Sequence, residues 1–324
     1  MPIPVRRVLH DTGADNVRGI GLVCGAYLLM ALGDGSVKWA LPAIGLAGAM
    51  IGRGVFGAAT VAALAGARGW GRLRPVRWGL VALRSAVHST SSLLYYLGWQ
   101  LGLTLPDSYA INFSAPLLMT ALAVPLLHER LHWRRAASTA LGFAGVLVMV
   151  RPGGELWNMA ALVTLASIPL LAVSRNLTRL LATTETPECL SFWLLAAHVP
   201  AGLLLWAVLP IPSLPWLAVA AVAALGLANG VAHWLHSRAF ALAPVGALAP
   251  YEYTSLLWGG VVGWVAFREL PSRDALLGAA IVAAAGLYNL HREQVRKREE
   301  ARLGQLAAPE AVAAAAAMVH RGRE

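Results

Sequence analysis

The sequence predicts an all-α polytopic membrane protein of ten transmembrane helices, arranged as two inverted five-helix repeats with both termini in the cytoplasm. Three observations predict this fold: long uncharged stretches, an uneven distribution of basic residues, and an internal repeat. The chain has 324 residues, of which 58% are hydrophobic and only 13% are charged, whereas soluble domains are about 25% charged. Because so few polar residues cannot cover a soluble fold of this length, the expected solvent for most of the chain is lipid.

The uncharged stretches have the length that a membrane-spanning helix needs, roughly 20 residues. Residues 85–106, 108–128, 156–174 and 189–237 contain no Asp, Glu, Lys or Arg, and a proline-rich segment at 210–215 divides the last stretch into two. The stretches are continuously apolar rather than alternating, which favours helices over a β-barrel. The ten expected spans are residues 18–40, 43–65, 77–99, 106–127, 134–151, 157–180, 187–209, 215–240, 245–267 and 273–291.

The net charge of +10 would suggest a nucleic-acid partner in a soluble protein, but in a membrane protein Lys and Arg collect in cytoplasmic loops. With the N-terminus in the cytoplasm, most basic residues fall in inner loops or in the helix ends beside them. The outer side then holds only Lys38, Arg151, Arg268 and Arg273. This asymmetry predicts that both termini are cytoplasmic, which requires an even number of helices. Because the membrane accounts for the positive charge, no nucleic-acid partner is expected.

An internal repeat relates the two halves of the chain at a constant offset of 140 residues. The matched pairs are Asn112 with Glu252, Phe113 with Tyr253, Ser114 with Thr254, and Glu129 with Glu269. Their shared register predicts two five-helix halves, residues 18–151 and 152–291, flanked by cytoplasmic tails at 1–17 and 292–324. Because five is an odd number, the halves are inserted in opposite senses, and inverted repeats of this kind form a substrate site between them near the bilayer midplane.

The end of each fourth helix and the segment that follows the first of them resemble a known family. The residues concerned are Glu129, Glu269, Arg130 and Gly142-Phe143-Ala144-Gly145-Val146-Leu147-Val148-Met149-Val150-Arg151-Pro152-Gly153. They resemble the drug/metabolite transporter superfamily of the EamA type, and within it the chain is most similar to the YddG-type amino acid exporters. The resemblance implies a bacterial inner-membrane protein in which helices 1, 3, 4, 6, 8 and 9 surround a central cavity and helices 5 and 10 lie at the periphery.

Two of the expected spans carry stripes of polar and aromatic residues. The stripes consist of His88, Tyr95 and Trp99 on the span 77–99, and of Asn229 and His236 on the span 215–240. Residues three, four or seven apart share a helix face, so each stripe is expected to line the substrate cavity. The repeat offset relates Tyr96, rather than Tyr95, to His236, so which tyrosine faces the cavity stays open. The alternative is hydrogen bonding between helices without a solute.

Glu252 is the charged residue for which the sequence predicts a direct role, because a charge inside a span is costly and implies a function or a partner. Its carboxylate could hold a substrate ammonium group or take up a proton, and the alternative is a structural pair with an Arg or a His. The other expected cavity residues are Asn112, Tyr253, Trp258 and Arg53. For Arg53 the alternatives are a substrate carboxylate and a protein carboxylate such as Glu252.

Asp34 and Lys38 are four residues apart on the span 18–40 and can pair with each other, so a local ion pair or an outer gate is favoured there. The candidates for proton coupling are Glu252, Asp34 and His88. Arg84 and Arg175 lie close enough to the cytoplasmic side to snorkel, and Arg175 is expected to be structural.

The inverted repeat favours a secondary transporter that exports amino acids and related small metabolites by alternating access through a central cavity. The alternatives are uptake of a vitamin or other metabolite of the riboflavin type, and multidrug export. The sequence contains no GxSxG, HExxH or P-loop motif and no CxxC or His/Cys cluster, so no enzymatic activity, cofactor or metal is expected. The expected partners are a small-molecule substrate and the lipid bilayer, with the monomer as the functional unit.

Overall fold

The computed structural model describes residues 13–127, 133–151, 153–209, 214–243 and 248–288, together with residues 291, 292 and 295. These residues form helices and no strand, so the all-α class is confirmed for this part of the chain. The elements are α1 (Gly13–Gly66), η1 (Trp70–Leu73), α2 (Trp78–Gln100), α3 (Leu105–Asn112), α4 (Ala115–Leu127), α5 (Trp133–Met149), α6 (Met159–Leu181), α7 (Pro187–Ala196), α8 (His198–Val208), α9 (Trp216–Leu242), η2 (Ala249–Tyr253) and α11 (Thr254–Phe267). Residues 273–288 form one further helix.

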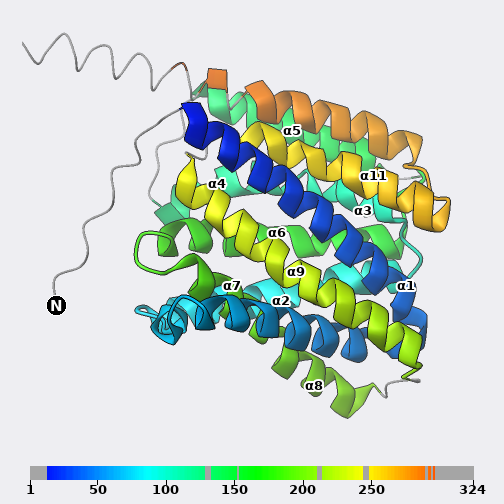
Figure 1. Cartoon of the computed structure of the whole chain (residues 1–324). Helices are drawn as coiled ribbons and strands as arrows, with labels where there is room; N and C mark the ends of the chain where they lie inside the picture. The colour runs from blue at the N-terminus through cyan, green and yellow to red at the C-terminus, as the bar shows by residue number, and fades with distance from the viewer. Residues whose placement is uncertain are drawn as a thin grey trace, which may run out of the picture.

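Successive helices run back and forth between two ends of the bundle (Figure 1). We call the end where α1 folds back and α3 begins the hinge end, and the end that carries η1 and the start of α7 the loop end. The dark-blue start of α1 and the orange end of the last helix both lie at the loop end (Figure 1). Glu129 and nearly all of the expected tails 1–17 and 292–324 lie outside the described residues, and the count of ten helices and the two repeats stay predictions.

The two spans expected at 18–40 and 43–65 form one kinked helix, α1, whose two arms meet at Gly45. Gly45 has φ 65° and ψ 178° inside the element, three residues after Pro42. Asp34 and Arg53 lie 3.0 Å apart, although 19 residues of straight helix would separate them by roughly 28 Å. The second arm therefore folds back beside the first, as two separate spans were expected to do.

Three of the expected spans are interrupted near proline residues. The spans concerned are 106–127, which becomes α3 and α4, 187–209, which becomes α7 and α8, and 245–267, which becomes η2 and α11. Proline lacks an N–H and its ring clashes with the carbonyl four residues earlier. Pro116 therefore leaves the carbonyl of Asn112 without its helical donor, and Pro200 does the same to Ala196. Only Ala197 separates α7 from α8, and Pro187–Val208 together are still long enough to cross a membrane.

Small residues bring the helix axes close together. Gly226 and Gly230 of α9 lie against the second arm of α1, where a Cβ on Gly230 would meet the carbonyl oxygen of Gly57 at 2.6 Å. On the other side of the bundle α2 packs along α6, and a Cβ on Gly98 would overlap the hydroxyl of Thr164. Such contacts are typical of helix association in lipid, where no hydrophobic force drives helices together and close packing takes its place.

The outer surface has the character of a lipid-facing one. Among the described residues, four helices are long and apolar enough to cross a membrane: Val17–Gly66, Met159–Leu181, Pro187–Val208 and Trp216–Ala239. Leucine, valine and tryptophan side chains are widely exposed on the bundle. Five tryptophans at or next to helix ends are each more than half exposed, as expected for an interfacial belt: Trp70, Trp78, Trp133, Trp157 and Trp216.

The fold-back of α1 depends on a backbone conformation that only glycine adopts without strain. We expect Gly45→Ala to lower stability by about 1–3 kcal/mol, the usual cost of a side chain in this region of φ and ψ, and to lower the thermal unfolding midpoint of the full chain in detergent. Gly21→Ala on the same helix is the matched control, because a Cβ there meets nothing within 4 Å. Equal midpoints for the two variants would contradict a hinge at Gly45.

Candidate functional site

An ion pair inside the bundle, which we call the central ion pair, joins the two arms of α1. Arg53 donates from Nη1 to Asp34 Oδ1 at 3.0 Å and to the hydroxyl of Tyr96, and its Nη2 lies 3.4 Å from His233 Nε2. Tyr109 donates its hydroxyl to the second carboxylate oxygen of Asp34 at 2.9 Å. Both charges are therefore paired and hydrogen-bonded, which is the condition under which an ion pair is tolerated inside a protein or a membrane.

Three imidazoles lie beside this pair. The ring of His88 on α2 is 5.8 Å from that of His198 and 6.2 Å from that of His233. His198 is fully buried, and its Nδ1 lies 2.9 Å from the carbonyl oxygen of Leu194. The Nε2 atoms of His88 and His198 are buried without a hydrogen-bond partner among the described residues. These nitrogens keep hydrogen-bonding capacity in the interior of the bundle.

Trp99 contacts both Tyr95 and Tyr96, the two alternatives for the tyrosine that faces the cavity. Its ring stacks on Tyr96 with centroids 5.3 Å apart and meets Tyr95 edge-on at 5.1 Å. Its indole Nε1 donates to the hydroxyl oxygen of Ser108 on α3 at 2.9 Å. Tyr96 is the buried member that binds Arg53, whereas Tyr95 is partly exposed.

A second polar region lies where two helix breaks meet. We call it the break cavity; its volume is about 10 Å³, and it is lined by Tyr27, Asn112, Phe113, Pro116, Arg175, Glu252, Tyr253 and Ser255. Arg175 on α6 donates from Nη1 to Glu252 Oε2 on η2 at 3.4 Å. The side-chain oxygen of Asn112 is buried without a hydrogen-bond partner among the described residues. The break cavity therefore combines a cation, an anion and an open acceptor.

Two further candidates lie near the break cavity without lining it. His236 is 3.5 Å from the hydroxyl of Tyr27, so α9 supports that wall. Trp258 is partly buried and packs against the apolar clusters, and its indole nitrogen is buried without a partner among the described residues.

Asn229 and Arg53 line a separate hollow of about 10 Å³. At about 10 Å³ each, this hollow and the break cavity have room for about one water molecule, far less than the roughly 300–1,000 Å³ of typical ligand pockets. The structure therefore represents a closed conformation, and a metabolite would require the bundle to open.

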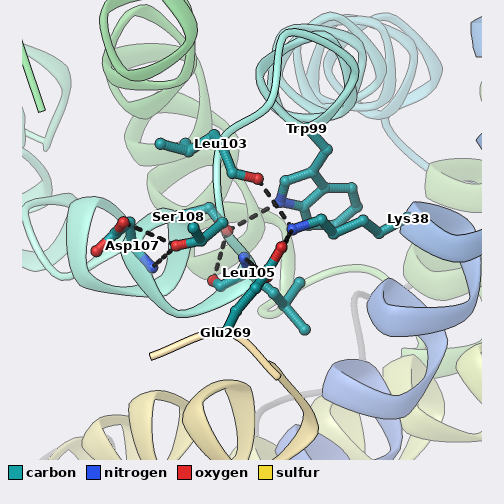
Figure 2. Close-up of polar contacts among 8 residues, drawn as sticks. Lys38, Trp99, Leu103, Leu105, Asp107, Ser108 and Glu269 are labelled. Atoms are coloured by element: carbon teal, nitrogen blue, oxygen red, sulfur yellow. Dashed lines mark hydrogen bonds and ion pairs between the residues drawn. The ribbon is translucent and has the colours of Figure 1, made fainter. Parts of the chain in front are cut away.

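The hinge end is closed by an ion pair that the sequence did not predict (Figure 2). Lys38 donates to Glu269 Oε1 and Oε2 at 2.5 and 2.6 Å and to the carbonyl oxygen of Leu103 at 3.0 Å, while Glu269 Oε2 accepts from the backbone N–H of Leu105 at 2.8 Å. We call Lys38 and Glu269 the hinge-end latch. It joins the first arm of α1 to the start of α3 and the chain after α11.

The loop end is closed by a different charge cluster. Glu188, at 2% exposure, accepts from Arg68 at 3.2 Å and from Arg72 at 3.0 Å. We call these three residues the loop-end latch. The indole nitrogen of Trp234 on α9 lies 3.4 Å from the same carboxylate. The latch therefore holds the start of α7 against the end of α1 and η1.

The structure corrects two pairings expected from the sequence. Asp34 and Lys38 do not pair with each other, because each side chain meets a partner on another segment. Arg53 holds Asp34 and not Glu252, which pairs with Arg175 instead. Spacing along one helix predicts only local partners, whereas the partners found here require the tertiary fold.

Arg84 does not snorkel. It is 3% exposed, and it donates to the hydroxyl oxygen of Thr178 at 2.6 Å and to the carbonyl oxygen of Leu190 at 2.7 Å. Arg84 therefore ties α2 to α6 and α7 in the interior.

Replacing one member of the central ion pair should destabilise the protein more than replacing both members together. We expect Asp34→Asn or Arg53→Gln alone to cost roughly 3–5 kcal/mol, because the partner charge remains buried without its counter-charge, and the double variant to cost much less than the sum. The measurement is a double-mutant cycle by reversible unfolding of the full chain in mixed micelles. Strictly additive losses would show that the two groups do not act as a pair.

The comparisons with known proteins point to one class. No protein-family model matches the chain. The riboflavin transporter of Rhizobium johnstonii is 31% identical over 236 residues, which are 69% of this chain and 78% of the relative. The S-adenosylmethionine uptake transporter of Rickettsia bellii is 27% identical over 221 residues, covering 65% and 74%, and the riboflavin transporter of Vibrio cholerae is 25% identical over 209 residues, covering 62% and 68%.

A solved crystal structure has the same fold, with a TM-score of 0.59 and 19% identity over 89% of this chain and 100% of that one. The similarity to the Rhizobium johnstonii protein extends over most of both sequences, and apolar helices make up the described bundle. The chain belongs to the family of bacterial multi-pass membrane transporters that includes this riboflavin transporter.

Proposed function

We propose that the chain takes up a vitamin or nucleoside-like metabolite, of the kind of riboflavin or S-adenosylmethionine, across the bacterial inner membrane. The observation that carries the proposal is the 31% identity to the Rhizobium johnstonii riboflavin transporter over 78% of that protein. Relatives named S-adenosylmethionine uptake transporters support import as the direction. The chain acts as a secondary transporter rather than an enzyme, as a monomer with both termini in the cytoplasm.

Features at the helix breaks support ten spans in two inverted repeats of the drug/metabolite transporter type. α3 ends at Asn112, directly before Phe113, and η2 ends at Tyr253. Phe113 and Tyr253 are matched by the 140-residue offset. Their rings are in contact, with centroids 5.0 Å apart. Contact between matched residues is expected on the pseudo-two-fold axis of an inverted repeat, and broken helices at that axis are where such transporters bind substrate.

The two latches support alternating access. They lie at opposite ends of the bundle, and each joins segments that must separate to open a path to the interior. Opening the hinge-end latch while the loop-end latch stays closed exposes the cavity to one side, and the reverse exposes it to the other. Within this cycle Glu252, Asp34 and His88 are the residues proposed for proton coupling.

Export of amino acids, with a YddG-type protein as the analogue, is the second candidate function. The observation that favours it is the Arg175–Glu252 pair in the break cavity. A zwitterionic amino acid could bind its carboxylate to Arg175 and its ammonium group to Glu252.

Transport assays separate the candidates. We expect the purified full chain in proteoliposomes to accumulate labelled riboflavin or S-adenosylmethionine by counterflow, with competition by the same unlabelled compound. Expression in a riboflavin-requiring host should allow growth at a lower riboflavin concentration if riboflavin is the substrate and import is the direction. Exchange of amino acids with neither compound moving would contradict the uptake proposal and favour export.

Charge reversal tests the hinge-end latch. Lys38→Glu or Glu269→Lys alone sets two like charges against each other, which costs several kcal/mol at close range, so transport should fall at least about tenfold. The double variant Lys38→Glu/Glu269→Lys restores opposite charges and should recover part of the rate. The recovery is partial because the N–H of Leu105 then faces a cation. No recovery in a correctly folded double variant would contradict the gate.

A further inference from the structure

The Arg175–Glu252 ion pair differs from the other buried pairs of the described bundle. Its single contact is 3.4 Å long, whereas Lys38 contacts both oxygens of Glu269 at 2.5 and 2.6 Å. The side chains of Arg175 and Glu252 keep 25% and 19% of their surface exposed, and both line the break cavity. The pair is therefore held by one long contact, and both of its members line the break cavity.

The neighbours of Glu252 supply further acceptors for a cation. The side-chain oxygen of Asn112 is buried without a hydrogen-bond partner among the described residues and lines the same cavity. The backbone carbonyl of Asn112 has no helical donor, because the residue four positions later is Pro116, which lacks an N–H. An unsatisfied buried acceptor is costly and calls for a partner. The side-chain oxygen of Asn112 and the carboxylate of Glu252 suit an ammonium group, which offers three donors.

Arg175 supplies the complementary group. A guanidinium binds a carboxylate through two parallel hydrogen bonds, which is a stronger arrangement than one long contact. Arg175 comes from α6 and Glu252 from η2, so a ligand that separates them bridges two elements. Tyr27, Phe113 and Tyr253 provide aromatic surface beside the charges.

We propose that the break cavity binds the zwitterionic head of an α-amino acid group, with its carboxylate on Arg175 and its ammonium on Glu252 and Asn112. The inference rests on the proposed function only in taking this cavity as part of the transport path. The head group replaces the Arg175–Glu252 contact by two better-matched ones, so neither protein charge is left alone. A ligand with only one of the two charges leaves one member of the pair without a counter-charge, and the site selects against it.

Head-group analogues test this assignment on the full chain in detergent. The probes are L-phenylalanine, its methyl ester, which lacks the carboxylate, and N-acetyl-L-phenylalanine, which lacks the ammonium; the same three forms of L-methionine form a second series. Each probe is titrated against the thermal unfolding midpoint, which rises when a ligand binds the folded state. We expect the zwitterion to bind roughly tenfold to a hundredfold more tightly than either derivative, the range for one charge-assisted hydrogen bond.

Two single variants should change this preference in opposite ways. Arg175→Gln should remove the discrimination against the methyl ester and keep that against the N-acetyl compound, whereas Glu252→Gln should do the reverse. The double variant Arg175→Gln/Glu252→Gln leaves no lone charge, so it should fold and bind all three forms equally. Arg151→Gln and Glu155→Gln, at exposed positions outside the cavity, are the matched controls and should keep the wild-type preference.

The outcomes separate this inference from the proposed function. Equal binding of the three forms by the wild-type chain, or binding of none of them, overturns the head-group site, even if proteoliposomes transport another metabolite. A preference for the zwitterion that both single variants leave unchanged also overturns it. Head-group selection in a protein that moves no solute supports the site and contradicts the transport proposal.

Discussion

The ion pair of Asp34 and Arg53 is the interaction on which the interior of this bundle depends. It joins the two arms of α1 across their fold-back, and its remaining hydrogen bonds go to Tyr96 on α2 and Tyr109 on α3. A buried ion pair adds little net stability over apolar residues of the same volume, but an arrangement that separates its members is strongly disfavoured. We infer that the pair selects one relative placement of these helices among the several that small apolar side chains would allow.

The central pair is connected to the hinge end by continuous contacts. Tyr96 stacks on Trp99, Trp99 donates to Ser108 on α3, and the first N–H of α3 is held by Glu269. A displacement of α3 therefore disturbs contacts of both the hinge-end latch and the Asp34–Arg53 pair. Contact of this kind gives a physical route by which occupation of the interior can bias the hinge end, because both depend on the position of one short helix.

The sequence predicted the helical class, because hydropathy alone marks the membrane spans. It also predicted most of the polar residues that meet in the interior, because a polar group within a span needs a partner away from lipid. What it could not predict were partners: Asp34 was assigned to Lys38, four residues away, whereas its partner is Arg53, which α1 brings close only by folding back. Glu269 was recognised through the repeat, yet its pairing with Lys38 depends on contacts between segments 231 residues apart.

The simultaneous closure of both latches has a consequence for the cell. A bundle with several charges and imidazoles in its interior is a potential path for protons, and an energised membrane that leaks protons loses its electrochemical gradient. With both ends closed and only narrow hollows between them, no wide aqueous path crosses the described bundle in this conformation. We infer that a bundle closed in this way would not discharge an energised membrane, whereas an open channel of equal polarity would.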